Sequence, residues 1–206
     1  MRSGIEQLGL TLVVLLTASL TVALDSSADD DFRERFGKGK RHMGLSLGVG
    51  TGFSLGFAGD GDGRNVDFFE LRPRLGAGIS DELGADKWYA GNFDFLVEGE
   101  FLFEFDHGTY QGGALLFRYN FLNGNRFFPF IEGGCGIGGL DFDLVDQDDG
   151  VSLSPQGGVG FHYFVGERVS LNAAARYFHI SNAGTHSPNN SINTVTFSTG
   201  FSYFLD

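Results

Sequence analysis

The chain has 206 residues, a length that suits one domain, and it contains 33 glycines, 23 phenylalanines and only 4 prolines. This composition argues against a disordered chain, because so many aromatic rings need to be buried, and against a mostly helical one, because glycine weakens helix interiors. The formal net charge of −12 argues against nucleic acid as a partner, since nucleic-acid binding uses basic patches.

The N-terminus has the pattern of a targeting segment. A short positive start precedes an apolar run over residues 8–20, and small residues follow up to Ala23. The run is shorter than the ~20 residues that a membrane helix needs. We therefore predict a signal peptide at residues 1–23, with an uncleaved anchor as the alternative, and a polar periplasmic lead-in at residues 24–41.

Alternation with a period of two is the strongest pattern in the rest of the chain. Between His42 and Phe57 one parity is mostly apolar and the other is glycine, serine or histidine. Between Asn92 and Phe105 a row of phenylalanines alternates with carboxylates and Asn92. Side chains of a strand alternate between its two faces, so each segment predicts a strand with one apolar face.

The pattern predicts an all-β fold, an eight-stranded antiparallel transmembrane β-barrel over residues 42–206. The segments exceed the mean strand length of soluble proteins and suit the ~9–11 residues that cross a bilayer. A soluble lipid-binding barrel with the phenylalanines inside is the competing fold. The expected strands span 42–57, 66–79, 88–105, 109–122, 127–141, 151–165, 168–181 and 193–205.

The connections alternate between short turns and longer loops, as in outer-membrane barrels, and an even strand number places both termini in the periplasm. Tight turns are expected at 80–86, 123–125 and 165–167. The small-or-polar face carries both signs of charge and is expected to fill the narrow lumen, which argues against a porin. Its charged members are Glu70, Arg72, Arg74, Glu98, Glu100, Glu104, Arg118, Glu132 and Arg176.

Three polar residues fall on the outward, lipid-facing parity near the outer end of the last two strands. His179 and Ser181 lie two residues apart on the seventh strand, and Asn193 lies beside them at the start of the eighth. Polar groups that face hydrocarbon are costly unless paired, and they often mark function. A serine nucleophile needs a base and a group that orients this base, so the three residues form a candidate triad. The alternative is that they are simply polar residues hydrated at the level of the lipid headgroups.

The segment His179-Ile180-Ser181-Asn182-Ala183-Gly184, followed by Pro188-Asn189 and then Asn193, resembles the active-site hairpin of lipid A 3-O-deacylases of the PagL type. A second stretch, from Phe128 to Gly138, is similar to the fifth strand of that family. The resemblance is best in the C-terminal half of the chain.

This resemblance implies an outer-membrane esterase that acts on lipid A, or on a related lipid of lipopolysaccharide type, without cofactor or metal. Ser181 is then the nucleophile, His179 the general base and Asn189 an oxyanion donor, with Asn182 ordering the turn. The family pattern has a glutamate where this chain has Asn193, which can orient a histidine but lends it no negative charge. A non-catalytic barrel with a structural or surface-interaction role is therefore the alternative function.

The single cysteine and one acidic stretch are expected to have no role in catalysis. Cys135 cannot form an internal disulfide and is expected to have only a packing role. The acidic stretch 141–149 could offer oxygen ligands to a divalent cation, but solvated loop charge is the preferred interpretation.

Overall fold

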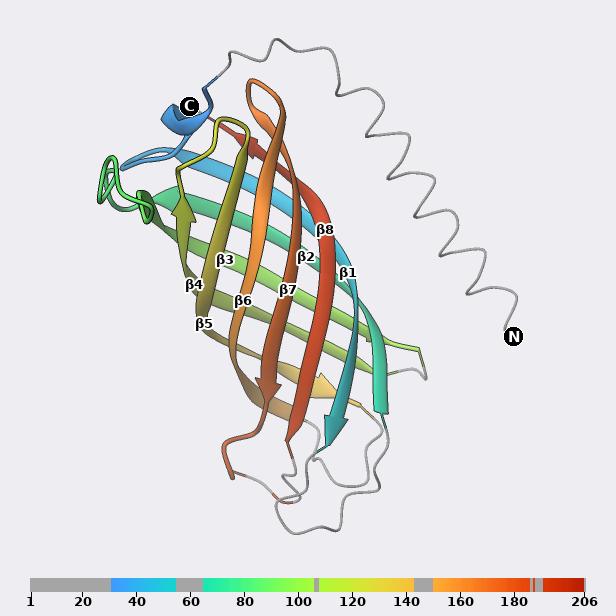
Figure 1. Ribbon diagram of the computed structural model, residues 1–206. Helices are drawn as coiled ribbons and strands as arrows, with labels where there is room; N and C mark the ends of the chain where they lie inside the picture. Colours follow the sequence, from blue (N-terminus) through green and yellow to red (C-terminus); the bar gives the residue numbers. More distant parts are fainter. Residues whose placement is uncertain are drawn as a thin grey trace.

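The computed structural model describes residues 31–54, 65–105, 108–142, 150–185, 187 and 191–205. Within these residues the chain forms a closed barrel of eight strands, each paired antiparallel with its neighbours in sequence, and the last strand closes onto the first (Figure 1). The expected eight-stranded antiparallel barrel is therefore confirmed. Its strands are β1 (Arg41–Ser54), β2 (Asn65–Gly78), β3 (Gly91–Glu104), β4 (Thr109–Phe121), β5 (Phe127–Asp141), β6 (Gly150–Gly166), β7 (Val169–Ile180) and β8 (Ile192–Phe204).

The strand limits agree within one residue with those expected, except before β3 and at residues 55–57 of the first expected strand, which lie outside the described residues. The expected strand began at residue 88, whereas β3 begins at Gly91. Residues 79–90 form a longer connection because the backbone turns twice there, with hydrogen bonds from Lys87 N to Gly84 O and from Ala90 N to Lys87 O. The tight turn expected at 80–86 is thus only part of this connection. In the part of the chain that the structure describes, no helix is both long and apolar enough to cross a bilayer.

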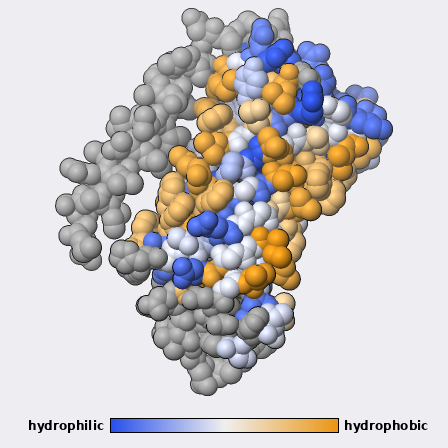
Figure 2. Space-filling view, turned by 180° about the vertical axis from the view of Figure 1, so that it is seen from behind, coloured by the Kyte–Doolittle hydropathy of each residue, from blue (hydrophilic) through white to orange (hydrophobic). Residues whose placement is uncertain are grey.

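Apolar side chains cover the outside of the barrel. Large hydrophobic residues of the outward parity are exposed on all eight strands, among them Val49, Leu75, Val97, Leu115, Ile137, Val159, Tyr177 and Phe197. Figure 2 shows hydrophobic residues over the middle of one side, with hydrophilic residues gathered at the upper end. In water such a surface would be unfavourable, whereas in contact with acyl chains it is the expected exterior.

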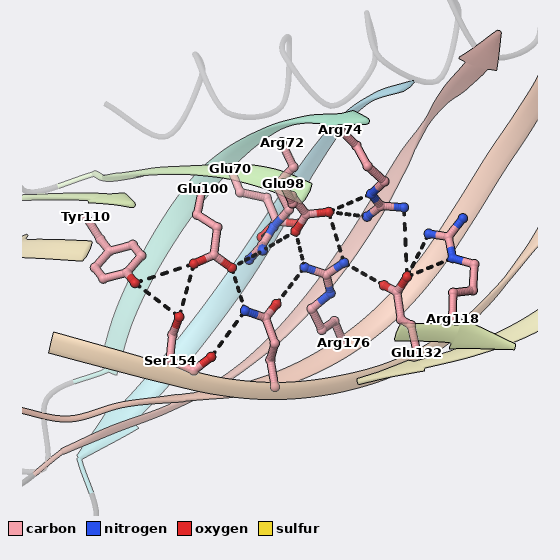
Figure 3. Close-up of polar contacts among 11 residues, drawn as sticks. Glu70, Arg72, Arg74, Glu98, Glu100, Tyr110, Arg118, Glu132, Ser154 and Arg176 are labelled. Atoms are coloured by element: carbon pink, nitrogen blue, oxygen red, sulfur yellow. Dashed lines mark hydrogen bonds and ion pairs between the residues drawn. The ribbon is translucent and has the colours of Figure 1, made fainter. Parts of the chain in front are cut away.

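The lumen is filled by a network of paired charges (Figure 3). Glu98 accepts hydrogen bonds from Arg72, Arg74 and Arg176, and Glu132 accepts them from Arg176 and Arg118. The predicted inward set is buried, with the exception of Glu104, which is partly exposed. A buried charge is tolerated when it is paired and hydrogen-bonded, so the two signs on the inner face stabilise one another.

Glycines on the inner face leave room for these long side chains. A Cβ atom at Gly48 would lie 2.7 Å from Glu70 Oε1, and one at Gly136 would lie 2.6 Å from Glu100 Oε2. The alternation of glycine with apolar residues thus sets both the lipid-facing surface and the space for the lumen network.

The end of the barrel that holds residues 31–40 and the C-terminus, here called the terminal end, is closed by aromatic packing. A short 3-10 turn, η1 (Arg33–Arg35), lies between Phe32 and Phe36. Both rings are buried against Leu122, Phe128, Phe164 and Phe204. These two phenylalanines belong to the segment expected as a polar lead-in, and their packing was not anticipated.

Candidate active site

The candidate site lies on the outside of β7 and β8, at the end of the barrel opposite the terminal end. The strand register pairs His179 directly with Asn193. Paired residues of antiparallel strands point to the same side of the sheet. Tyr177, on the same parity as His179, is 48% exposed on the outer surface. The side chains of His179 and Asn193 therefore lie on the outer face, as the alternation predicts.

His179 and Asn193 are joined by a hydrogen bond. The Nδ1 atom of His179 lies 2.9 Å from Oδ1 of Asn193. Because an amide oxygen only accepts, the imidazole donates from Nδ1, and in the neutral ring Nε2 then carries the lone pair. A histidine held in this tautomer can accept a proton at Nε2.

Ser181 follows β7 and continues its pairing with β6. Its backbone N–H and carbonyl bond to Leu153, whose side chain is 41% exposed on the outer surface. Ser181 is partly exposed and lies on the same face as His179, two residues along the strand direction. Its Oγ accepts a hydrogen bond from the backbone N–H of Ala183 at 3.2 Å.

Asn182 orders the turn that follows the serine. Its side chain is buried, and its Oδ1 accepts a hydrogen bond from the Gly184 N–H at 2.9 Å. Its carbonyl accepts bonds from both the N–H and the hydroxyl of Thr185. The backbone then passes through two left-handed residues, Ala183 (φ 55°) and Gly184 (φ 75°). A non-glycine residue in this conformation is strained, and such strain is common beside functional sites.

Some expected features lie outside the described residues. Asn189, the expected oxyanion donor, is one of these, as are residues 143–149 of the acidic stretch. The predicted site residues that the structure describes are therefore His179, Ser181, Asn182 and Asn193.

Tyr177 shares the outward parity of His179 and has no predicted role. Its hydroxyl donates a hydrogen bond to Oδ1 of Asn193 at 2.5 Å, the same oxygen that His179 contacts. Asn193 is only 6% exposed. The available signal was the position of Tyr177, two residues before His179 on one strand face.

An apolar groove lies on the outer wall across β5 to β8, between the level of Ala175 and the terminal end of the barrel. Its central residues are neighbours in the strand register: Val159 pairs with Ala175, which pairs with Phe197. Ala175 lies two residues from Tyr177 on the same face of β7. The small side chains of Ala173 and Ala175 form the floor, and Phe127 and Phe161 lie on one side. The groove thus begins one outward position below Tyr177 on β7, on the same face of the barrel as the polar cluster.

Comparison with known proteins gives one family. The family model for lipid A 3-O-deacylase (PagL) matches residues 65–202, well over half of the chain, and the match contains all three outward polar residues of the candidate triad. A search of curated proteins found no match.

Several solved barrels share the fold. The crystal structure of the outer membrane enzyme PagL has a TM-score of 0.54 and 18% identity, and the alignment covers 77% of this chain and 97% of that one. The crystal structure of Neisserial surface protein A (NspA) has a TM-score of 0.57 and 15% identity, with 81% and 97% covered. The N-terminal barrel domain of OprF from Pseudomonas aeruginosa has a TM-score of 0.50 and 14% identity, with 81% and 99% covered.

These structural likenesses concern the fold, whereas the family match concerns the sequence of β2 to β8. The apolar exterior, the charged lumen and the family match agree in placing the protein in the outer membrane. The chain belongs to the lipid A 3-O-deacylase (PagL) family.

Proposed function

We propose that this protein is an outer-membrane esterase that removes an ester-linked acyl chain from lipid A or a related lipid through a serine acyl-enzyme. The observation that carries the proposal is the hydrogen bond between His179 Nδ1 and Asn193 Oδ1 on the outer face, with Ser181 next along the same face. An enzyme that deacylates a membrane lipid needs its nucleophile outside the barrel, near the level of the headgroups. Family membership supports the same activity.

In the proposed reaction, Ser181 Oγ attacks the ester carbonyl while Nε2 of His179 takes its proton. The resulting tetrahedral intermediate carries an oxyanion, for which Asn189 is the proposed hydrogen-bond donor on the basis of the family resemblance. The C–O bond to the sugar then breaks, and His179 returns the proton to the leaving hydroxyl. Water activated by the same histidine hydrolyses the acyl-Ser181 ester and releases the fatty acid.

The apolar groove supports a long acyl chain as the group that is removed. A chain that extends from Ser181 along the outer wall would lie over Ala175, between Val159 and Phe197. Only a long chain bound at Ser181 would reach this groove. The groove therefore favours a lipid over a short, soluble ester.

Hydrolysis of defined lipid A in detergent micelles tests the proposal, with the released fatty acid and the deacylated lipid followed by mass spectrometry. The Ser181→Ala variant should lose about 10³-fold or more in kcat, because the nucleophile acts as a unit with its base. Ser187→Ala, an exposed serine in the same loop, is the matched control and should keep full activity. Equal hydrolysis by wild type and Ser181→Ala would exclude Ser181 as the nucleophile, and no hydrolysis by the wild type would favour the non-catalytic barrel.

A further inference from the structure

A single atom of Asn193, its side-chain oxygen Oδ1, accepts two hydrogen bonds. Tyr177 Oη donates to Oδ1 at 2.5 Å, and His179 Nδ1 donates to the same oxygen at 2.9 Å. The register pairs Asn193 with His179 and Val195 with Tyr177, so the tyrosine reaches the amide diagonally across the two strands. Aromatic side chains are long enough for such diagonal contacts.

The orientation of the Asn193 amide decides which nitrogen of His179 can act as a base. With Oδ1 toward the ring, Nδ1 holds the proton and Nε2 is free to accept one from Ser181. With Nδ2 toward the ring, the amide would donate to Nδ1, the proton would sit on Nε2, and the ring could not accept the proton of Ser181. A glutamate has no such choice, because both of its oxygens accept.

A second donor on the amide oxygen favours the productive orientation. A phenol donates a hydrogen bond more readily than it accepts one, because its oxygen lone pair is delocalised into the ring. Turning the amide over would therefore replace the strong Tyr177 hydrogen bond with a weaker one. The free-energy cost is large because Asn193 is buried, with only 6% of its surface exposed, and a poorly satisfied polar group is unfavourable there.

We propose that Tyr177 is a positioning residue, which holds the Asn193 amide with its oxygen toward His179 and so keeps the imidazole in the tautomer that can serve as base. The inference rests on the proposed function, and it applies to a chain with asparagine at position 193. With a glutamate there, the tyrosine would no longer be needed to select an orientation.

The test compares Tyr177→Phe in two backgrounds, the natural chain and Asn193→Glu. In the natural chain the substitution should lower kcat by about tenfold and leave KM nearly unchanged. In the Asn193→Glu background it should change kcat by less than about twofold. Tyr203→Phe, which removes the hydroxyl of another outward tyrosine on β8 near the terminal end, is the control and should have no effect.

A readout independent of hydrolysis separates this inference from the proposed function. Nitrogen chemical shifts of ¹⁵N-histidine-labelled protein in micelles report the His179 tautomer, and His179→Gln assigns the signal among the five histidines. The natural chain should show the proton on Nδ1, and Tyr177→Phe should shift the population toward Nε2.

An unchanged tautomer in Tyr177→Phe, or an equal loss of kcat in both backgrounds, would overturn the positioning role. A wild type that hydrolyses lipid no faster than Ser181→Ala would refute the proposed function instead, and the tautomer measurement would still decide the role of Tyr177.

Discussion

The barrel has two sets of polar side chains, one in the lumen and one on the outer wall, and they differ in what they can reach. In the lumen, Glu98 and Glu132 are closed in by arginines that satisfy them. On the outer wall, His179 is held at Nδ1 by Asn193, and Ser181 is partly exposed beside it. The lumen set contains far more charge, yet only the outer set lies on the lipid-facing surface. The lumen set is thus internally paired, whereas the outer set is placed where the proposed reaction requires it.

Breaking the lumen network should give the largest effect, on stability and not on chemistry. Glu98→Gln leaves Arg72, Arg74 and Arg176 without their shared negative partner. Removal of one partner from a buried ion pair costs about 3–5 kcal/mol, so the urea midpoint of unfolding in lipid vesicles should fall strongly. The exposed Asp67→Asn is the control and should change stability by less than about 0.5 kcal/mol. The folded fraction of Glu98→Gln should retain wild-type activity. A loss of kcat per folded molecule would show that the lumen charges also contribute to the activity of the outer site.

Restoring a negative charge on the outer wall should have a smaller effect, in the direction of gain. In Asn193→Glu the carboxylate can accept the hydrogen bonds of both Tyr177 and His179 and can stabilise the imidazolium that forms during the reaction. We expect kcat/KM on lipid A to rise about tenfold. Asn125→Glu, at an exposed turn of the terminal end, controls for net charge. An unchanged or lower rate in Asn193→Glu would show that this site does not use a charged third member.

Filling the groove should have the smallest effect and should depend on the acyl chain. Ala175→Phe places a ring between Val159 and Phe197, where the chain is proposed to lie. We expect kcat/KM to fall about threefold for long acyl chains and to stay unchanged for short-chain esters, since only the lost groove contacts differ. Leu171→Phe, on the same face of β7 but outside the groove, is the control. Equal losses of kcat/KM for long and short acyl chains would show that the acyl chain does not bind in the groove.

The alternation in the sequence was sufficient to predict most of this architecture. A period of two assigns each residue to a face, which placed Glu98 and Arg176 inside and His179 outside before any contact was known. The placement of Asn193 beside His179 followed from the antiparallel arrangement of the last two strands. The structure confirms the pairing, whereas the catalytic roles of these residues stay proposals.

Other features depend on information that periodicity does not carry. Phe32 and Phe36 stand singly in a polar segment, and only the finished barrel provides the ring cluster that buries them. The contact between Tyr177 and Asn193 depends on the exact strand register and on side-chain direction, so alternation predicts the face of Tyr177 but not its partner. The connection before β3 was underestimated because the backbone makes a further turn from Lys87 to Ala90, over the first residues of the expected strand.

The most direct test of the proposed chemistry is covalent labelling of the folded protein with a serine-reactive lipid phosphonate, read by intact mass and peptide mapping. Attack by Ser181 Oγ on phosphorus should give one adduct on that residue in the wild type and none in Ser181→Ala. His179→Gln should slow the labelling about 10³-fold, because the serine loses its base. A folded wild-type protein that acquires no adduct, or that is labelled equally in Ser181→Ala, would contradict an esterase site on the outer wall.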